Sequence, residues 1–466
     1  MTIAGMANCH QPQDIDGIKM VSANSGAVSV VKSIGPLLLM PGVGRINAVS
    51  FFAVALINNI IFSLVHYMQP YIFEVQLNVP PDQQGVLVGN LTVMQEIIVI
   101  AMTGVAGVLA DRFGRRPIFV FGTLLIGVAY SLYPIAESTS TLYLARAFFG
   151  VGIACASTVL LVFTGDYSQE VSRGKWLAAM NIMQGLGAVT ASFALTKVPG
   201  FLQQHYDVDP VSAGAVVFLI AAAIAVVGAI VAGVGLKPAT AQRDEVNRAP
   251  LSQLFAEGFR EARANPRTAL SFAASMTARG DMVVIGAFTF LWLVRYSSDM
   301  GMGIQGAYAR GQLIVPLITL MIVLSAPVMG VIFDKSDRVS GIIIAFVLAS
   351  IGYIFMGFIE NPFSNATLFA AVLVGLGEGA CIMSSIALVG QNAPEKTRGS
   401  VIGTFAACGA VGMLIATGVG GYLFDHWTYT GPYLLMGVAN SLVVIFAIYV
   451  KVKCPEEKPS EAASFK

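Results

Sequence analysis

The sequence predicts an all-α membrane protein whose twelve transmembrane helices form two pseudo-symmetric six-helix bundles. Three observations support this prediction: a low content of charge, twelve long apolar runs and an internal repeat. Only 11% of the 466 residues are charged and 56% are hydrophobic, whereas about a quarter of the residues of a soluble globular protein are charged. The composition therefore excludes a soluble enzyme, and a net charge of +1 gives no basic surface for nucleic acid.

The apolar runs are long enough to cross a membrane. A bilayer core of about 30 Å requires roughly 20 apolar residues in one helix. Backbone polar groups in hydrocarbon must be satisfied within the segment, so we interpret each run as an α-helix. The predicted spans lie near residues 46–73, 85–110, 116–137, 141–165, 174–197, 211–236, 268–294, 310–333, 339–360, 365–391, 399–424 and 431–453.

The distribution of basic residues predicts the orientation, because short loops rich in Lys and Arg stay in the cytoplasm. With both termini inside the cell, 22 of the 27 basic residues fall in cytoplasmic segments. Lys197, Arg295 and Arg310 fall at the outer ends, and Arg146 and Arg279 lie within spans. We therefore expect a multi-pass protein of the plasma membrane, or of the inner membrane in a bacterium, with both termini cytoplasmic. The polar first tail lacks the pattern of a cleaved signal peptide.

A polar segment from Lys237 to Arg267 separates two halves of six spans each. Apolar residues recur there at helical spacing, at Leu251, Leu254, Phe255 and Phe259. Charged residues lie between them, which predicts an amphipathic helix along the cytoplasmic interface. The predicted organisation is a cytoplasmic tail at 1–44, a six-helix bundle at 45–237, a linker at 238–267, a second six-helix bundle at 268–453 and a cytoplasmic tail at 454–466.

An internal repeat supports the division into halves. A shift of 225 residues places Gly150-Val151-Gly152 on Gly375-Leu376-Gly377, and it also places Arg173-Gly174 on Arg398-Gly399. Two parallel halves related by an axis along the membrane normal are one architecture in which transporters enclose a site at the membrane midplane.

A loop motif stands at the cytoplasmic end of the second span, from Gly107 to Arg116: Gly-Val-Leu-Ala-Asp-Arg-Phe-Gly-Arg-Arg. It resembles the loop signature of the major facilitator superfamily, and the resemblance extends over all twelve spans. The second half carries a copy from Gly330 to Arg338, which has Asp337 where a second glycine is expected. The fifth span lacks the Gly-Pro pair that is typical of the drug antiporters of this family.

The resemblance implies that the aspartate of the signature, Asp111, helps to close the cytoplasmic side in the outward-facing state. We therefore expect the motif and its copy to act in gating and not in substrate contact. The predicted gating residues are Gly107, Asp111, Arg112, Gly114, Arg115, Asp334 and Arg338.

Four ionisable residues lie near the middle of their spans. Glu96 is in the second span, Arg279 and Asp281 are in the seventh, and Glu378 is in the tenth. Ionisable groups inside a membrane are costly, so they are expected to face a cavity or a partner. The resemblance implies a central cavity lined by the first, fourth, seventh and tenth spans. The predicted substrate-binding residues are Arg279, Arg146, Asn58, Asn59 and Gln184.

The three midplane carboxylates Glu96, Asp281 and Glu378 surround one midplane arginine. Desolvation and like-charge repulsion disfavour their charged forms, so we expect at least one to carry a proton near neutral pH. Glu378 is the first candidate for proton coupling, Asp281 the second, and Glu96 is equally well interpreted as a structural group. In the alternative interpretation, Arg279 forms a structural salt bridge with Glu378 or Glu96. Residues two apart on a helix point about 200° apart, so Arg279 and Asp281 should not pair.

The leading hypothesis is a proton-coupled secondary active transporter of a small organic solute. A guanidinium grips carboxylate or phosphate through a planar fork, so Arg279 and Arg146 favour an organic anion or zwitterion. The alternatives are a proton-coupled efflux antiporter for amphipathic compounds and a non-transporting membrane sensor or scaffold. No nucleophile with its base can be identified, so we do not expect an enzyme. We also expect no cofactor, no metal, no nucleic-acid partner and a monomer in the lipid bilayer, with the solute and protons as partners.

Overall fold

The computed structural model describes residues 14–15, 18–22, 28–35, 37–238, 251–335, 337–394 and 397–454. Within these residues, twelve helical segments are long and apolar enough to cross a membrane, which confirms the predicted fold class. The helices of the first half are α1 (Arg45–Tyr71), α2 (Gln84–Phe113), α3 (Arg115–Leu132), α4 (Thr139–Tyr167), α5 (Arg173–Val189), α6 (Val198–Tyr206) and α7 (Pro210–Gly235). Those of the second half are α9 (Pro266–Asp299), α10 (Ile304–Lys335), α11 (Arg338–Gly357), α12 (Asn365–Asn392), α13 (Arg398–His426) and α14 (Gly431–Lys453).

Two spans depart from regular α-helix near one end of the molecule. The first continues past Pro70 into a π-helical turn, Ile72–Gln76. The fifth passes through a π-helical turn, Thr190–Ala194, and a 3₁₀ turn, Leu195–Lys197, before α6. Both segments are therefore longer than the sequence predicts: the π-helical turn carries the first to Gln76, beyond the predicted limit of 73, and α6 carries the fifth to Tyr206, beyond the predicted limit of 197.

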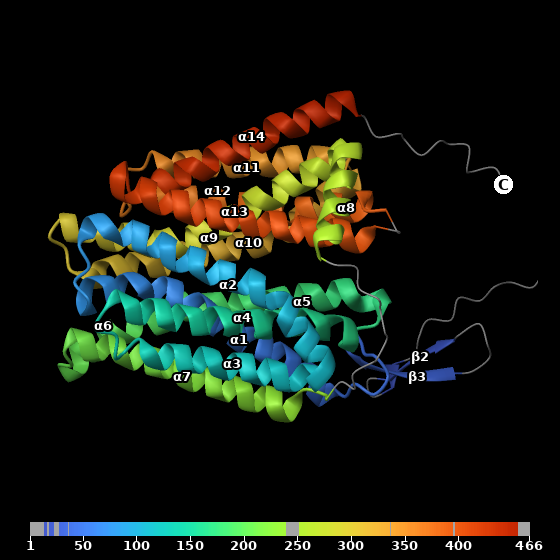
Figure 1. The fold of residues 1–466 in the computed structure, drawn as a ribbon, viewed down its shortest axis with the longest axis horizontal. Helices are drawn as coiled ribbons and strands as arrows, with labels where there is room; N and C mark the ends of the chain where they lie inside the picture. The colour runs from blue at the N-terminus through green and yellow to red at the C-terminus, as the bar shows by residue number, and fades with distance from the viewer. Residues whose placement is uncertain are drawn as a thin grey trace, which may run out of the picture.

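The helices run side by side, and the two halves lie one above the other in Figure 1. We call the end with strands β2 (Ile18–Ser22) and β3 (Val28–Ile34) and with α8 (Leu251–Ala264) the terminal end. The opposite, distal end carries the loops 77–83, 133–138, 207–209, 300–303, 358–364 and 427–430. Within the first half α3 packs against α4 and α7, and within the second α11 packs against α12 and α14. Across the halves α2 packs against α13, α5 against α10 and α1 against α9.

The linker forms the helix α8, which packs against α13 and α9. The hydroxyl of Ser400 on α13 donates a hydrogen bond of 2.5 Å to Glu257. Phe255 and Phe259 are 37% and 52% exposed. The helix thus presents apolar side chains outward, and its position at a membrane interface stays a prediction.

The first tail contains a sheet that the sequence analysis does not predict. Four strands, β1 (Asp14–Ile15), β2 (Ile18–Ser22), β3 (Val28–Ile34) and β4 (Leu37–Leu38), pair in sequence order as an antiparallel sheet. After β4, Leu39 is 1% exposed and bridges to Ser168 beyond α4. The N–H of Gln169 donates to the carbonyl of Leu38, and that of Met40 to Tyr167. The segment from Leu38 to Met40 is therefore packed against the loop between α4 and α5.

Close contacts at glycine allow the helices of the second half to pack tightly. A Cβ atom added at Gly377 of α12 would lie 2.5 Å from the Cα of Ala349 on α11. A Cβ at Gly379 would lie 2.1 Å from the hydroxyl of Ser325 on α10. Small residues let helix backbones approach closely, which is how helices in membranes associate.

We predict that Gly377→Val lowers the free energy of unfolding by about 1–3 kcal/mol, because the added side chain overpacks the contact with α11. Denaturant titration in detergent micelles measures this change. Gly390→Val is the matched control, since it lies on the same helix and a Cβ there meets no atom within 4 Å. Equal losses in the two variants would contradict the packing argument.

Candidate functional site

The two halves are joined by polar contacts at the distal end. The hydroxyl of Tyr308 on α10 donates to the carbonyl of Tyr67 on α1 at 3.0 Å. The amide of Gln312 donates to the hydroxyl of Thr196 at 3.1 Å. Further hydrogen bonds link Ser298 to Glu74, Gln204 to Gln305, Gln305 to Gln203, and both Gly85 and Val86 to Asp425. Between described residues, every hydrogen bond found across the halves lies at this end.

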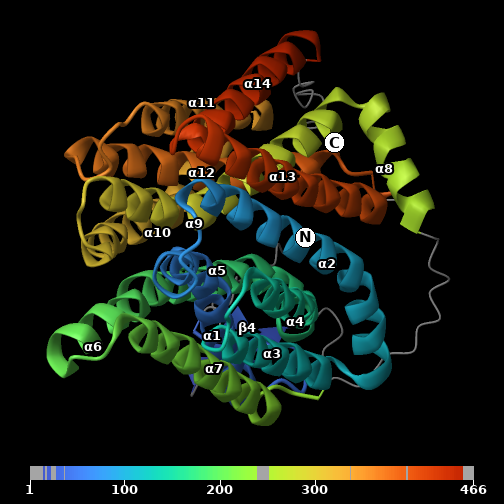
Figure 2. The same ribbon diagram turned by 60° about the vertical axis from the view of Figure 1, so that its left-hand side comes forward.

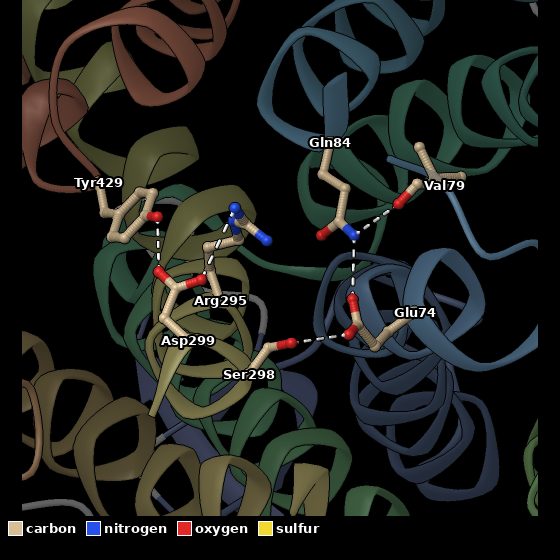
Figure 3. Close-up of polar contacts among 7 residues, drawn as sticks. All are labelled: Glu74, Val79, Gln84, Arg295, Ser298, Asp299 and Tyr429. Atoms are coloured by element: carbon tan, nitrogen blue, oxygen red, sulfur yellow. Dashed lines mark hydrogen bonds and ion pairs between the residues drawn. The ribbon is translucent and has the colours of Figure 1, made fainter. Parts of the chain in front are cut away.

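Figure 3 shows part of this distal contact. Glu74 accepts one hydrogen bond from Ser298 of the other half and one, at 3.0 Å, from Gln84 of its own half. On the second half, Asp299 accepts from the hydroxyl of Tyr429 at 2.6 Å and lies 3.7 Å from the guanidinium of Arg295. Carboxylates on both sides of the contact are therefore held by neighbouring donors.

The separation of α2 and α13 differs between the two ends of the molecule, as the space around their glycines shows. A Cβ at Gly89 would lie 2.7 Å from the carbonyl oxygen of Thr417, and one at Gly421 would lie 2.3 Å from that of Gly85. Gly107 and Gly403 lie 18 residues, or about five turns, further along the same helix faces. A Cβ at either position meets no atom within 4 Å. The faces that touch at the distal end therefore separate toward the terminal end, as the diverging ribbons of α2 and α13 in Figure 2 also show.

Asp281 and Glu378 lie in the interior of the second half. Asp281 is fully buried, and the amide of Asn440 on α14 donates to both of its carboxylate oxygens, at 2.9 and 3.1 Å. Glu378 is 1% exposed, and its Oε2 atom has no hydrogen-bond partner. The two carboxylates are close enough to repel each other electrostatically. Neither forms an ion pair within 4.0 Å with a basic side chain among the described residues.

Arg279 and Asp281 lie on different sides of α9, as expected for residues two apart on a helix. The side chain of Arg279 is exposed, and its Cγ lies beside Gly409 of α13. Glu96 on α2 is half-buried and within electrostatic range of Arg279. The alternative salt bridge of Arg279 with Glu378 or Glu96 is not formed in this conformation, because no such pair lies within 4.0 Å.

Arg146 is buried within the first half and held by amides. Its Nη1 atom donates to Gln95 at 2.7 Å and its Nη2 atom donates to Gln69, while Nε has no partner. Gln95 in turn donates to Glu96 at 3.1 Å. The side chain is fully buried in this conformation, and its contact with substrate stays a prediction.

The predicted polar residues Asn58, Asn59 and Gln184 do not form one cluster of side chains. The amide of Asn59 donates to the backbone carbonyl of Gln184 at 2.5 Å. Asn58 is 1% exposed, and neither its Oδ1 nor its Nδ2 atom has a partner. A buried amide with no partner is uncommon, and the contact of Asn58 with solute stays a prediction.

The residues of the loop signature lie where α2 and α3 meet at the terminal end. Gly114 has φ 97°, a conformation that favours glycine. Arg115 forms an ion pair with Asp166 of α4, and Arg112 lies over the ring of Phe113 at 5.4 Å. The sequence analysis missed Asp166, although an acid at the end of the fourth span beside a basic loop is a usable signal.

The gating residues of the second half are only partly described. Asp337 caps α11 by accepting from the N–H of Ser340 at 3.2 Å, which explains an aspartate at the position of the expected glycine. Asp111 and Arg338 each interact with at least one other group. The side chain of Asp334 lies outside the described residues.

A cavity of about 270 Å³ lies between the halves at the distal end. Its lining includes Tyr71, Lys197, Gln203, Gln305 and Tyr308, and it contains none of the predicted site residues. Within the described part of the chain, no group of three or more His, Cys, Asp or Glu side chains is placed to hold a metal ion.

Comparisons with known proteins agree with this architecture. The sequence profile of the Major Facilitator Superfamily matches residues 47–322 and 311–465. The magnetosome protein MamH of Paramagnetospirillum magneticum is 28% identical over 400 residues, which cover 84% of this chain and 89% of that protein. The crystal structure of the nucleoside transporter NupG superposes with a TM-score of 0.67 at 13% identity, covering 89% of this chain and 100% of that chain. That of a D-xylose-proton symporter gives a TM-score of 0.65 at 14% identity, covering 86% and 97%.

We predict that Gln95→Leu lowers the free energy of unfolding by about 1.5–3 kcal/mol, because it removes a hydrogen bond from a buried guanidinium. Denaturant titration in micelles measures the loss. Gln184→Leu is the control, since the structure gives the side chain of Gln184 no hydrogen bond and only its backbone carbonyl is engaged. In an Arg146→Met background the cost of Gln95→Leu should disappear, and an unchanged cost there would contradict the pairing.

Proposed function

Because the chain belongs to the major facilitator superfamily, we propose that it is a proton-coupled secondary active transporter of a small organic solute. The two halves rock about a site near the membrane midplane and expose it alternately to the two sides. The observation that carries this proposal is the pair of buried carboxylates, Asp281 and Glu378, which have no basic partner within 4.0 Å.

The orientation follows from the basic residues. The junction of α2 and α3 at the terminal end carries Arg112, Arg115 and Arg116, and α8 of the linker lies at the same end. We therefore assign the terminal end to the cytoplasm and the protein to the plasma membrane, or to the inner membrane of a bacterium. In that orientation the described conformation is inward-facing, since its distal contacts are closed and the glycine faces of α2 and α13 are apart at the terminal end.

Protons are the coupling ion in this proposal. A charged carboxylate buried without a cation is costly, so Glu378 is stable in this interior only when it carries a proton. Asp281 differs, because Asn440 donates to both of its oxygens and thereby stabilises a charge. Glu378 therefore serves as the group that loads and releases the proton, and Asp281 raises the cost of its ionisation by repulsion.

The solute is an organic anion or zwitterion. Arg279 supports this assignment because this residue of α9 is exposed and forms no ion pair within 4.0 Å with a described carboxylate. A guanidinium with free donors can grip a carboxylate or phosphate through its planar fork. Arg146 already donates to Gln95 and Gln69, so we assign it to the support of Glu96 and not to the first contact with solute.

Under this proposal Glu378→Gln abolishes solute accumulation driven by a pH gradient but preserves solute exchange, because an amide cannot release a proton. Proteoliposomes with an imposed gradient, a pH-sensitive dye and candidate solutes measure both activities. Glu360→Gln is the control, since Glu360 is an exposed carboxylate at the distal end. Gradient-driven accumulation that persists in Glu378→Gln would remove this residue from coupling. In the same assay, expulsion of solute as protons enter would show that the protein is an efflux antiporter and not an importer.

The charge of the solute can be tested by ligand binding. A thermal-shift screen of anions, zwitterions, cations and sugars should find ligands that stabilise the folded protein, and these should carry an anionic group. Arg279→Gln should weaken their binding by about ten- to a hundredfold, because a hydrogen bond to a charged group is lost. Arg279→Lys should retain part of the affinity. A stabilising cation or sugar whose affinity is unchanged in Arg279→Gln would contradict the assignment.

A further inference from the structure

Asp425, near the distal end of α13, contacts the beginning of α2 in the opposite half. One carboxylate oxygen accepts a hydrogen bond from the N–H of Gly85 at 2.8 Å, and the other accepts from the N–H of Val86 at 2.6 Å. The first N–H groups of a helix have no partner within the helix and carry a partial positive charge. The carboxylate therefore meets two open donors and the favourable end of the helix dipole.

The cap that α2 lacks within its own half is supplied by the other half. Gln83, at the N-cap position of α2, forms no capping hydrogen bond with its side chain. Asp425 takes that place although it lies 340 residues away along the chain. The bond depends on the approach of the halves, because Asp425 and Gly85 belong to helices on opposite sides of the interface.

Glycine makes this approach possible. A Cβ at Gly85 would lie 2.6 Å from the Oδ1 atom of Asp425 and 2.8 Å from the carbonyl oxygen of Gly421. No larger residue fits there while the distal end is closed. Once α2 and α13 move apart at this end, both hydrogen bonds to Asp425 break together.

We propose that Asp425 is the distal latch, a positioning residue that holds the outer side closed by capping α2 across the interface. The inference rests on the proposed alternation of access but not on the solute or on proton coupling. In this proposal, one side chain contributes much of the free-energy difference between the distal-closed and distal-open states. Loss of the cap should shift this balance toward the distal-open state by about five- to thirtyfold, which is the usual effect of removing a helix cap.

The chain offers a matched control in Asp209. This carboxylate caps α7 by accepting from the N–H of Ser212 at 2.9 Å, and both residues lie in the first half. Replacing Asp209 removes a helix cap but leaves the contacts between the halves intact. A purely structural role for Asp425 would therefore give the same behaviour as loss of Asp209.

The test measures the accessibility of two reporter positions in the full-length protein after its native cysteines are replaced. Thr417→Cys reports the distal side, because Thr417 is fully buried and its hydroxyl bonds only carbonyls of its own helix. Gly403→Cys reports the terminal side, where a Cβ meets no atom within 4 Å. The rate of labelling by a membrane-impermeant maleimide is measured for each reporter, with access from its own side.

With Asp425→Ala, labelling of the distal reporter should accelerate about five- to thirtyfold while labelling of the terminal reporter slows. Asp425→Asn should give a smaller change, since its amide oxygen can still accept from one N–H, and this variant serves if the alanine variant does not fold. Asp209→Ala should leave both rates unchanged. Unchanged rates with both Asp425 variants would overturn the latch, and so would faster labelling of both reporters, which indicates general loosening. Because no solute is present, failure of the transport proposal would not alter this result.

Discussion

The close contact between α2 and α13 at the distal end determines how the two halves are placed. Gly85, Gly89 and Gly421 let the two backbones approach so closely that a single methyl group would clash with a carbonyl oxygen. Five turns further along, the same faces meet nothing within 4 Å. Without a strong hydrophobic driving force between helices in lipid, packing of small residues and interhelical hydrogen bonds hold such an interface. The contact is therefore tight at one end and reversible in principle, which a rocking motion requires.

Four charged groups inside the spans have four different environments. Arg146 is fully buried and satisfied by neutral amides, Asp281 is buried and bonded by Asn440, and Glu378 keeps an oxygen without a partner. Arg279 instead is exposed and lies within electrostatic range of Glu96 in the other half. Since an unsatisfied buried charge is costly, the group with the fewest partners is the one whose protonation most easily changes. This ranking places Glu378 ahead of Asp281 and Glu96 in the proposed coupling.

The sequence was sufficient to predict the membrane class, the twelve spans and the family, because hydropathy over about 20 residues and an ordered loop motif are local signals. Counting along each span also placed Glu96, Arg279, Asp281 and Glu378 near mid-depth. The direction of each side chain was not predictable in the same way. The guanidinium of Arg146 lies between Gln95 of α2 and Gln69 of α1, which the sequence could not show because the rotation of α4 depends on its packing against those helices.

Features that depend on pairs far apart in the chain were missed. Leu39 pairs with Ser168, and Asp425 bonds backbone N–H groups near residue 85. A backbone donor carries no signature in the sequence, and an isolated aspartate at the end of a span is otherwise interpreted as an interfacial charge. The strands of the first tail were missed for the same reason, since they are defined by pairing with one another, and Leu38 and Met40 bond to residues at the end of α4 and just after it.

Rocking of the two halves changes the distance between α2 and α13 at the terminal end, and this distance can be measured. Spin labels attached to the variants Gly104→Cys and Gly403→Cys report the separation of α2 and α13 at the terminal end, where both positions have open space. If the halves rock, this distance has two populations, one for each state. The population with the shorter distance should grow as pH and solute are varied. A single distance that stays the same in every combination of pH and solute would contradict the rocking of the halves.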